Sequence, residues 1–160
     1  MTILAGARVK AADLLLPDEV AGYSGGTNTI TATTFTDLPT NACAVSITNP
    51  HPTADMLVAV HCGHWINLPV SPAFTRACPR VSGSITIAAG VTSVGGGHAG
   101  WGMVCGTNVQ GNVQHSGYAT YTLPPGTATF TMQAYKDSAA AGTHQVNYSV
   151  IQVTPLRYLF

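Results

Sequence analysis

Hydrophobic and polar residues alternate along most of the chain from residue 29 onward. The clearest run covers residues 127–135, where alanine, phenylalanine or methionine at every second position alternates with threonine or glutamine. Because successive side chains of a β-strand point to opposite faces, this period of two predicts a strand with one buried face. Similar runs predict further strands at residues 43–48, 55–62, 84–87, 99–105, 118–123 and 146–153.

Turn-forming residues separate these runs, as in Asn49–Pro52 and Pro124–Gly126. Proline cannot donate a hydrogen bond to a strand ladder, and glycine permits the positive φ that many turns require. About eight short strands at fairly regular spacing predict an all-β chain. We therefore expect an antiparallel β-sandwich that is jelly-roll-like.

The last run changes phase along its length. Val146, Tyr148 and Val150 share one predicted face, and Ile151 and Val153 then take the apolar positions. One extra residue in a strand shifts the alternation in this way. The change of phase predicts a bulge, or a strand that crosses to another contact.

Residues 1–26 lack the alternation, so the sequence predicts an N-terminal arm at 1–26 and a sandwich domain at 27–160. Residues 11–16 are expected to form one or two helical turns that stop at Pro17, and the glycines at 22–26 to form a flexible join. The arm either packs on its own sandwich or reaches a neighbouring subunit, and we favour the contact with a neighbouring subunit. The apolar arm and the apolar C-terminus supply the expected oligomer and partner contacts: Ile3, Leu4, Val9, Leu14, Leu15, Leu16, Leu156, Tyr158, Leu159 and Phe160.

The charge content excludes several classes of protein. The 160 residues suit one domain, and six Lys and Arg balance six Asp and Glu, so that charged residues are 8% of the chain. No basic stripe is available to neutralise phosphates, so nucleic-acid binding is not expected. No apolar stretch approaches the roughly 18–20 residues of a membrane span. A surface so poor in charge promotes association, and we expect an oligomer.

The N-terminus lacks the apolar run of a signal peptide, because Arg8 and Lys10 interrupt it. We therefore expect the chain to be made and kept in a cytoplasm. Disulfides are rare in that compartment. The four cysteines, Cys43, Cys62, Cys78 and Cys105, are expected to be free, buried thiols rather than disulfides.

The segment from His61 to His64 is the densest group of candidate metal ligands. On a strand, Cys62 and His64 share one face while His61 takes the other. A zinc site needs about four converging ligands, which Cys43 and Cys78 would have to complete. We expect a core thiol with polar loop histidines and no cofactor, and a metal at His61, Cys62 and His64 stays an open alternative.

A catalytic site is not recognisable. Residues 22–26 match the G-x-S-x-G pattern formally, but that motif works on a strained turn between a strand and a helix of an α/β sheet. The few acidic residues and histidines show no readable triad or pair. We expect a protein that is not an enzyme.

Trp65 suggests a different class of function. It is expected at the end of a strand beside Gly63 and His64, where it serves as a core residue or as an interface or ligand contact. The tryptophans and tyrosines together could include a platform on which sugars stack: Trp65, Trp101, Tyr23, Tyr118, Tyr121, Tyr135, Tyr148 and Tyr158. Since β-sandwiches can carry lectin sites, a carbohydrate-binding module that contacts a cell-surface glycan is the competing interpretation.

The opening residues 6–15, GARVKAADLL, resemble the G-x-x-V-x-A-S/A-D-L opening of small β-rich structural proteins of tailed bacteriophages, especially those of actinobacterial hosts. The threonine-rich strands and the segment YTLPPGTATF at 121–130 are similar as well. Such chains occur as minor tail proteins and as head decoration proteins, and the family has no catalytic residues.

The resemblance implies a non-enzymatic virion protein, assembled in the host cytoplasm, that self-associates and binds other tail or capsid subunits. We expect a symmetric homo-oligomer and favour a homotrimer. A minor tail or tail-tip component is favoured, and a capsid decoration protein that stabilises the head is the alternative. A glycan of the host surface is a further candidate partner.

Overall fold

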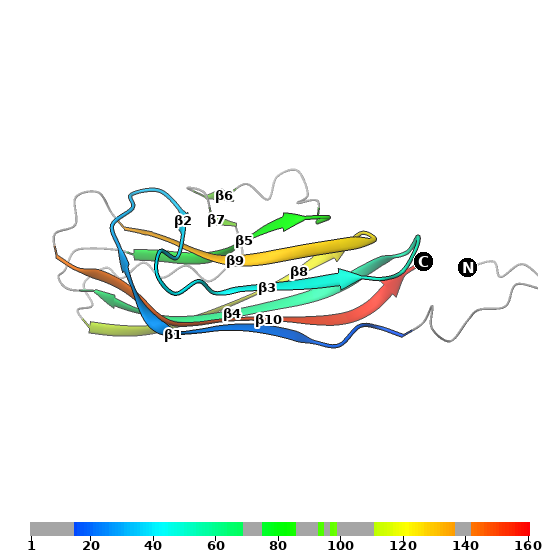
Figure 1. The fold of residues 1–160 in the computed structure, drawn as a ribbon, viewed down its shortest axis with the longest axis horizontal. Helices are drawn as coiled ribbons and strands as arrows, with labels where there is room; N and C mark the ends of the chain where they lie inside the picture. The colour runs from blue at the N-terminus through cyan, green and yellow to red at the C-terminus, as the bar shows by residue number, and fades with distance from the viewer. Residues whose placement is uncertain (1–14, 69–74, 86–92, 95–96, 99–110, 137–141) are drawn as a thin grey trace, which may run out of the picture.

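The computed structural model describes residues 15–68, 75–85, 93–94, 97–98, 111–136 and 142–160. Within these ranges the chain is all-β, and it includes no helix long and apolar enough to cross a membrane. Two antiparallel sheets pack against each other in an elongated sandwich (Figure 1). The predicted fold, an antiparallel β-sandwich of about eight strands, is confirmed.

The first sheet has four long strands. Their order is β1 (Val20–Ile30), β10 (His144–Leu159), β4 (Asp55–Leu68) and β8 (Gly111–Leu123). In the second sheet, β9 (Gly126–Lys136) pairs with β2 (Thr36–Asp37), β3 (Ala44–Asn49) and β5 (Thr75–Gly83). The short strands β6 (Ser93–Val94) and β7 (Gly97–His98) pair with each other.

The long strands alternate between the sheets along the chain. β1, β4, β8 and β10 belong to the first sheet, and β3, β5 and β9 belong to the second. The first long strand pairs with the last, because β10 lies between β1 and β4. Strands that follow each other in sequence thus face each other across the core, which is the jelly-roll arrangement.

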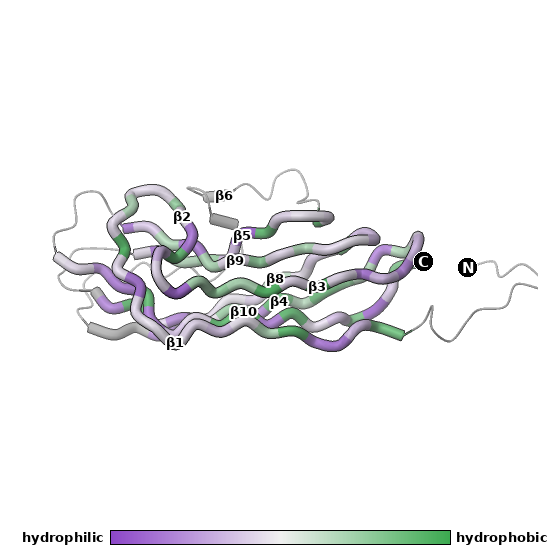
Figure 2. The backbone as a smooth tube through the Cα atoms, viewed as in Figure 1, coloured by the Kyte–Doolittle hydropathy of each residue, from purple (hydrophilic) through white to green (hydrophobic). Residues whose placement is uncertain are grey.

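The core lies between the two sheets and contains the apolar positions of the alternating runs. Figure 2 shows hydrophobic and polar positions along the strands. The inward residues of β4 and β9 are almost completely buried, as the alternation predicts. The largest of the fully buried apolar side chains are Phe130, Met56, Ile66, Leu123, Met132, Ile151, Val58, Val60 and Val146.

The region around residues 20–26 differs from the prediction. β1 begins at Val20 and continues to Ile30, so these glycines lie in a strand and not in a flexible join. A Cβ atom at Gly22 would overlap the carbonyl oxygen of Ala44, so the glycine lets β1 approach β3 closely. The boundary between arm and sandwich stays a prediction, because residues 1–14 lie outside the described residues.

Two further predictions also concern regions beyond the described residues. Most of the expected helical turn at 11–16 falls there, and the described residues Leu15 and Leu16 are not helical. The expected strand at 99–105 lies there as well.

The predicted bulge in β10 is confirmed, but it occurs earlier than the hydrophobic pattern indicates. The pairing with β4 shifts between Asn147 and Val150, so Tyr148 and Ser149 together lie opposite one residue, His64. As a result Ser149 is buried and Tyr148 is exposed. The prediction placed Tyr148 on the apolar face with Val146, which was wrong because it put the extra residue after position 150.

Candidate functional site

One end of the sandwich exposes apolar side chains. Leu15 is 68% exposed and Phe160 is 71% exposed, and Leu156, near Phe160 in sequence, is also exposed. The hydroxyl of the buried Tyr158 donates a hydrogen bond of 3.0 Å to the carbonyl oxygen of Leu15. The ring of His51 lies 5.0 Å from that of Tyr158 and 5.7 Å from that of Phe160. We call these five residues the apolar end.

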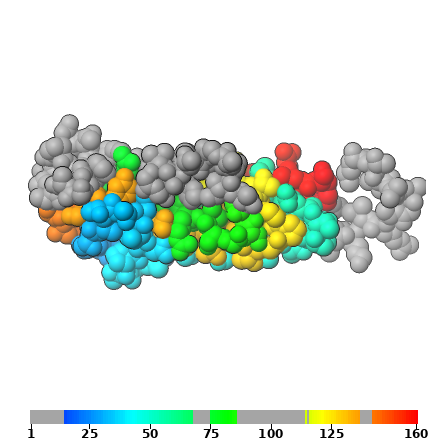
Figure 3. Space-filling view, turned by 90° about the horizontal axis from the view of Figure 1, so that it is seen from above, coloured from blue at the N-terminus to red at the C-terminus, as the bar shows by residue number. Residues whose placement is uncertain are grey.

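The apolar end includes several of the predicted partner contacts. Leu15, Leu156 and Phe160 are exposed there, and Leu159 is partly exposed. Leu16 packs against the core. Tyr158, which was also predicted to make such contacts, is buried. The remaining predicted contacts lie outside the described residues: Ile3, Leu4, Val9 and Leu14. Figure 3, a space-filling view turned by 90° from Figure 1, shows the C-terminal residues at one end of the long axis.

A second surface, the aromatic face, lies on the outside of the first sheet. It consists of Tyr23 on β1, Trp65 on β4, Tyr118 on β8 and Tyr148 on β10, one residue from each strand. Their exposed fractions are 67%, 42%, 59% and 51%, respectively. Four large aromatic side chains on a single sheet face are therefore open to solvent.

Two of these rings contact each other. The centroids of Trp65 and Tyr148 are 5.4 Å apart, and the ring planes are inclined by 66° in an edge-to-face arrangement. This geometry is favourable for aromatic pairs and holds both rings in place.

The bulge in β10 has a complementary irregularity in β1. The pairing between these strands shifts between Ser24 and Thr27, so that Gly25 and Gly26 lie opposite Tyr148. The ring of Tyr23 lies over Gly25, because a Cβ atom there would come within 3.0 Å of the Cε1 atom of Tyr23. The glycines thus leave room for the two tyrosines on adjacent strands.

The pairing of the four strands shows which residues lie between the aromatic side chains. Val150 of β10 pairs with both Tyr23 and Gly63, and Gly63 pairs in turn with Ser116 of β8. Two positions further along, His61 pairs with Tyr118. Since glycine has no side chain, β4 exposes backbone at Gly63, between Trp65 and His61, with Val150 and Ser116 on the neighbouring strands.

Uncharged polar side chains accompany the aromatic rings. Gln114, Ser116 and Thr120 are exposed on β8, on the same face as Tyr118. The Nδ2 atom of Asn67 donates to the Oε1 atom of Gln145 at 3.4 Å.

Glu19 is the acidic group next to this face. Its Oε1 atom accepts a 2.7 Å hydrogen bond from Gln152, and its Oε2 atom accepts a 2.6 Å hydrogen bond from Thr154. These bonds, that from Thr154 first, lower the pKa of Glu19 below its usual value, so the carboxylate is ionised at neutral pH.

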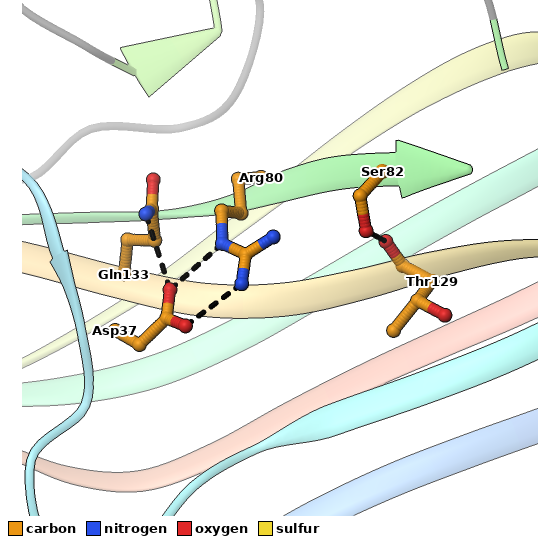
Figure 4. A network of polar contacts seen from close by, with 5 residues as sticks. All are labelled: Asp37, Arg80, Ser82, Thr129 and Gln133. Carbon is orange, nitrogen blue, oxygen red and sulfur yellow. Dashed lines mark hydrogen bonds and ion pairs between the residues drawn. The ribbon is translucent and has the colours of Figure 1, made fainter.

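The outer face of the second sheet has a different character. Hydroxyl pairs join β3 to β9, with 2.8 Å between the side-chain oxygens of Ser46 and Thr129. The carboxylate of Asp37 accepts two hydrogen bonds of 2.8 Å from Arg80 and one of 3.1 Å from Gln133 (Figure 4). This face is polar and carries an ion pair, whereas the aromatic face is neutral and rich in rings.

The histidines and cysteine of residues 61–64 lie within β4 and not in a loop, which corrects the prediction of loop histidines. Cys62 and His64 point inward and are buried, and His61 is exposed, as the strand alternation predicts. In the described part of the chain, no group of three or more His, Cys, Asp or Glu residues is placed to hold a metal ion.

The described cysteines are free and buried, as predicted: Cys43, Cys62 and Cys78. Burial raises the pKa of the Cys43 thiol to about 11 and that of the Cys62 thiol to about 12. Cys78 lies in β5. Such thiols serve as small apolar side chains of the core.

Ser24, the serine of the G-x-S-x-G pattern, lies in the middle of β1 and is buried. Its hydroxyl donates a 3.0 Å hydrogen bond to the carbonyl oxygen of Asn41. The residue therefore connects β1 to the segment before β3 and is not presented on a turn.

Sequence reasoning identified Trp65 as a possible ligand contact but placed it at the end of a strand, whereas it lies inside β4. It named Tyr23, Tyr118 and Tyr148 with Trp65 among the aromatic residues that could include a sugar-stacking platform. It could not tell which of them share a sheet face, because strand order cannot be obtained from alternation. A signal was present for Tyr118, which falls on the polar side of its run.

Comparison of the sequence with models of known protein families finds no match, and comparison with curated proteins finds none either.

Proposed function

We propose that the chain is a non-enzymatic structural protein of a bacteriophage virion that self-associates and binds neighbouring virion subunits through its apolar end. A minor tail or tail-tip component is the favoured position, and a capsid decoration protein is the alternative. The resemblance of residues 6–15 and 121–130 supports the phage assignment. The jelly-roll fold is compatible with it, since viral capsid proteins use this architecture.

The observation that carries the proposal is the exposure of Leu15, Leu156 and Phe160 at one end of the sandwich. Burial of a leucine or phenylalanine side chain against a partner contributes about 1.5–3 kcal/mol. The contact between Tyr158 and Leu15 brings the first described residue to this end. A symmetric oligomer, with a trimer favoured, would cover these side chains.

Sedimentation of the purified chain tests self-association through this end. We expect the wild type to sediment as an oligomer and the double variant Leu156→Ser with Phe160→Ser to sediment as a monomer. Tyr118→Ser is the matched control, because it removes an equally exposed apolar side chain from the aromatic face. A wild type that stays monomeric at high concentration, or a double variant with unchanged mass, would contradict the proposal.

The position in the particle requires a separate experiment. Removal of residues 1–14 leaves β1 and every described residue intact, whereas removal of residues 1–26 would delete more than half of the 11 residues of β1. In phage particles assembled with the shortened chain, loss of head stability supports decoration, and loss of tail assembly or adsorption supports a tail position. Particles that assemble and infect normally would count against both positions.

A carbohydrate-binding module was the competing class in the sequence analysis. The aromatic face is a specific observation that favours glycan binding, and it involves none of the residues of the apolar end. The two functions are compatible in a single virion protein.

A further inference from the structure

We propose that the aromatic face binds an uncharged polysaccharide, with its sugar rings stacked on Trp65, Tyr148, Tyr23 and Tyr118. The proposal does not depend on association through the apolar end, because the two surfaces share no residue. The face spans four strands, so its two outer strands, β1 and β8, lie about 14 Å apart at the usual strand spacing. This width accommodates several sugar units of one chain.

Trp65 and Tyr148 form the best-defined part of this surface. The planes of the two rings are inclined by 66°, so the edge of one ring points at the face of the other. This arrangement leaves a ring face free for a ligand, with the second ring next to it. The C–H face of a sugar stacked on one ring would therefore meet the edge of the second. Because each ring is held by the other, little side-chain freedom is lost when the sugar binds.

The backbone at Tyr148 is held in an unusual conformation to present this ring. Its φ is 50°, and it is the non-glycine residue with positive φ in the described part of the chain. A bulky residue in this region is strained, and such strain is concentrated at functional sites. Without the bulge, the alternation would have turned Tyr148 into the core and removed it from Trp65.

The polar groups on this face suit sugar hydroxyls. Amides and hydroxyls of Gln114, Ser116 and Thr120 lie on the same face of β8 as Tyr118, and Asn67 and Gln145 lie beyond Trp65. These side chains both donate and accept hydrogen bonds. A sugar needs an aromatic surface for its C–H face and neutral hydrogen-bonding groups for its hydroxyls, and this face offers both.

The charge of the surface selects against other polymers. Among the described residues of the first sheet, the arginine nearest to the aromatic face is Arg157. It pairs with Leu57, which is four residues before His61 on β4. The ionised Glu19 lies at the border of the face, bound to Gln152. Among the described residues Glu19 forms no ion pair, and a negative carboxylate repels phosphate and uronate polymers, so an uncharged glycan is the matching ligand.

Affinity electrophoresis and tryptophan fluorescence test the proposal. The probes are four soluble neutral polysaccharides, dextran, mannan, galactan and xylan, and polygalacturonate is the charged comparison. The variants are Trp65→Ala and Tyr148→Asn, since asparagine tolerates the positive φ at position 148. Thr129→Val on the outer face of the second sheet is the matched control, and Phe160→Ser separates this site from the apolar end.

We expect at least one neutral polysaccharide to retard the wild type and to shift its fluorescence. Trp65→Ala and Tyr148→Asn should each weaken this binding on the order of tenfold. Thr129→Val and Phe160→Ser should bind as the wild type does. Unfolding curves of all variants confirm that each is folded.

Three results would overturn the proposal. The first is the absence of binding to all four neutral polysaccharides, and the second is binding that Trp65→Ala and Tyr148→Asn leave unchanged. The third is a lower sedimentation mass for Trp65→Ala than for the wild type, which would assign the aromatic face to a second copy of the chain. Failure of association at the apolar end would leave these measurements unaffected, so the two proposals fail separately.

Discussion

Trp65 and Tyr148 lie edge to face on the outside of the first sheet, with their ring centroids 5.4 Å apart. They come from neighbouring strands, β4 and β10, and the bulge after Asn147 turns Tyr148 outward. The contact therefore depends on one local change in register. It joins the non-glycine residue with positive φ among the described residues to the aromatic face.

The strain at Tyr148 predicts a difference between two substitutions that both remove the ring. Tyr148→Asn keeps a residue that tolerates a φ of 50°, whereas Tyr148→Val introduces a β-branched residue that does not. We expect the valine variant to be less stable than the asparagine variant by about 1–2 kcal/mol. Urea unfolding measures the difference. Equal stabilities would mean that the bulge relaxes when the ring is absent.

Much of the fold could be predicted from the sequence because the core of a sandwich imposes a period of two. Phe130 and Met132 are buried, and Tyr118 and Thr120 are exposed, as the alternation indicates. Wherever a strand is regular, side-chain orientation follows from position alone.

The rest depends on contacts that are distant in sequence. The pairing of β1 with β10 joins residues more than a hundred positions apart, and no local pattern contains it. The glycines at 25 and 26 look like a flexible join in isolation. They lie in a strand because they face the bulge at Tyr148. The aromatic face could not be predicted for the same reason, since its four rings come from four strands.

The ion pair of Asp37 and Arg80 predicts a small dependence of stability on pH. The hydrogen bonds from Arg80 hold the pKa of Asp37 below its ordinary value of 3.8. A carboxylate with a lowered pKa in the folded state stabilises the protein above its unfolded pKa. That stability is lost as the pH falls through the folded pKa. Both side chains are more than a third exposed, so the contribution is less than about 1 kcal/mol.

Asp37→Asn measures this contribution. At neutral pH we expect a loss of less than about 1 kcal/mol in the free energy of unfolding, reduced further by high salt. The difference from the wild type should shrink as the pH is lowered below 3.8. Asp18→Asn, which changes another exposed carboxylate, is the control. If the difference in the free energy of unfolding between Asp37→Asn and the wild type grows toward acid pH, the predicted direction of the pH dependence is wrong.

The raised pKa values of Cys43 and Cys62 predict protection from alkylation. At about pH 8 a thiol with a pKa of about 12 is ionised in roughly one molecule in ten thousand. Iodoacetamide should therefore leave both residues unmodified in the folded protein and label them fully in denaturant. Peptide mapping by mass spectrometry distinguishes the cysteines. Rapid labelling of Cys62 under native conditions would show that the sandwich opens locally.

The close approach of β1 and β3 predicts that Gly22 tolerates no side chain. A Cβ atom there would overlap the carbonyl oxygen of Ala44 and lie 2.9 Å from its carbonyl carbon. Both atoms belong to the backbone of the other sheet and can move away only if the two sheets separate. We expect Gly22→Ala to cost about 1–3 kcal/mol in the free energy of unfolding.

Gly25→Ala provides the comparison within the same strand. The three atoms nearest to a Cβ atom at Gly25 all belong to the side chain of Tyr23, with 3.0 Å to its Cε1 atom, and that exposed ring can rotate away. Its effect on the free energy of unfolding should stay within about 1 kcal/mol, because alanine also restricts the unfolded chain. Urea unfolding of the two variants compares the costs directly. If Gly22→Ala is as stable as Gly25→Ala, the contact between β1 and β3 does not limit the approach of the two sheets at this edge.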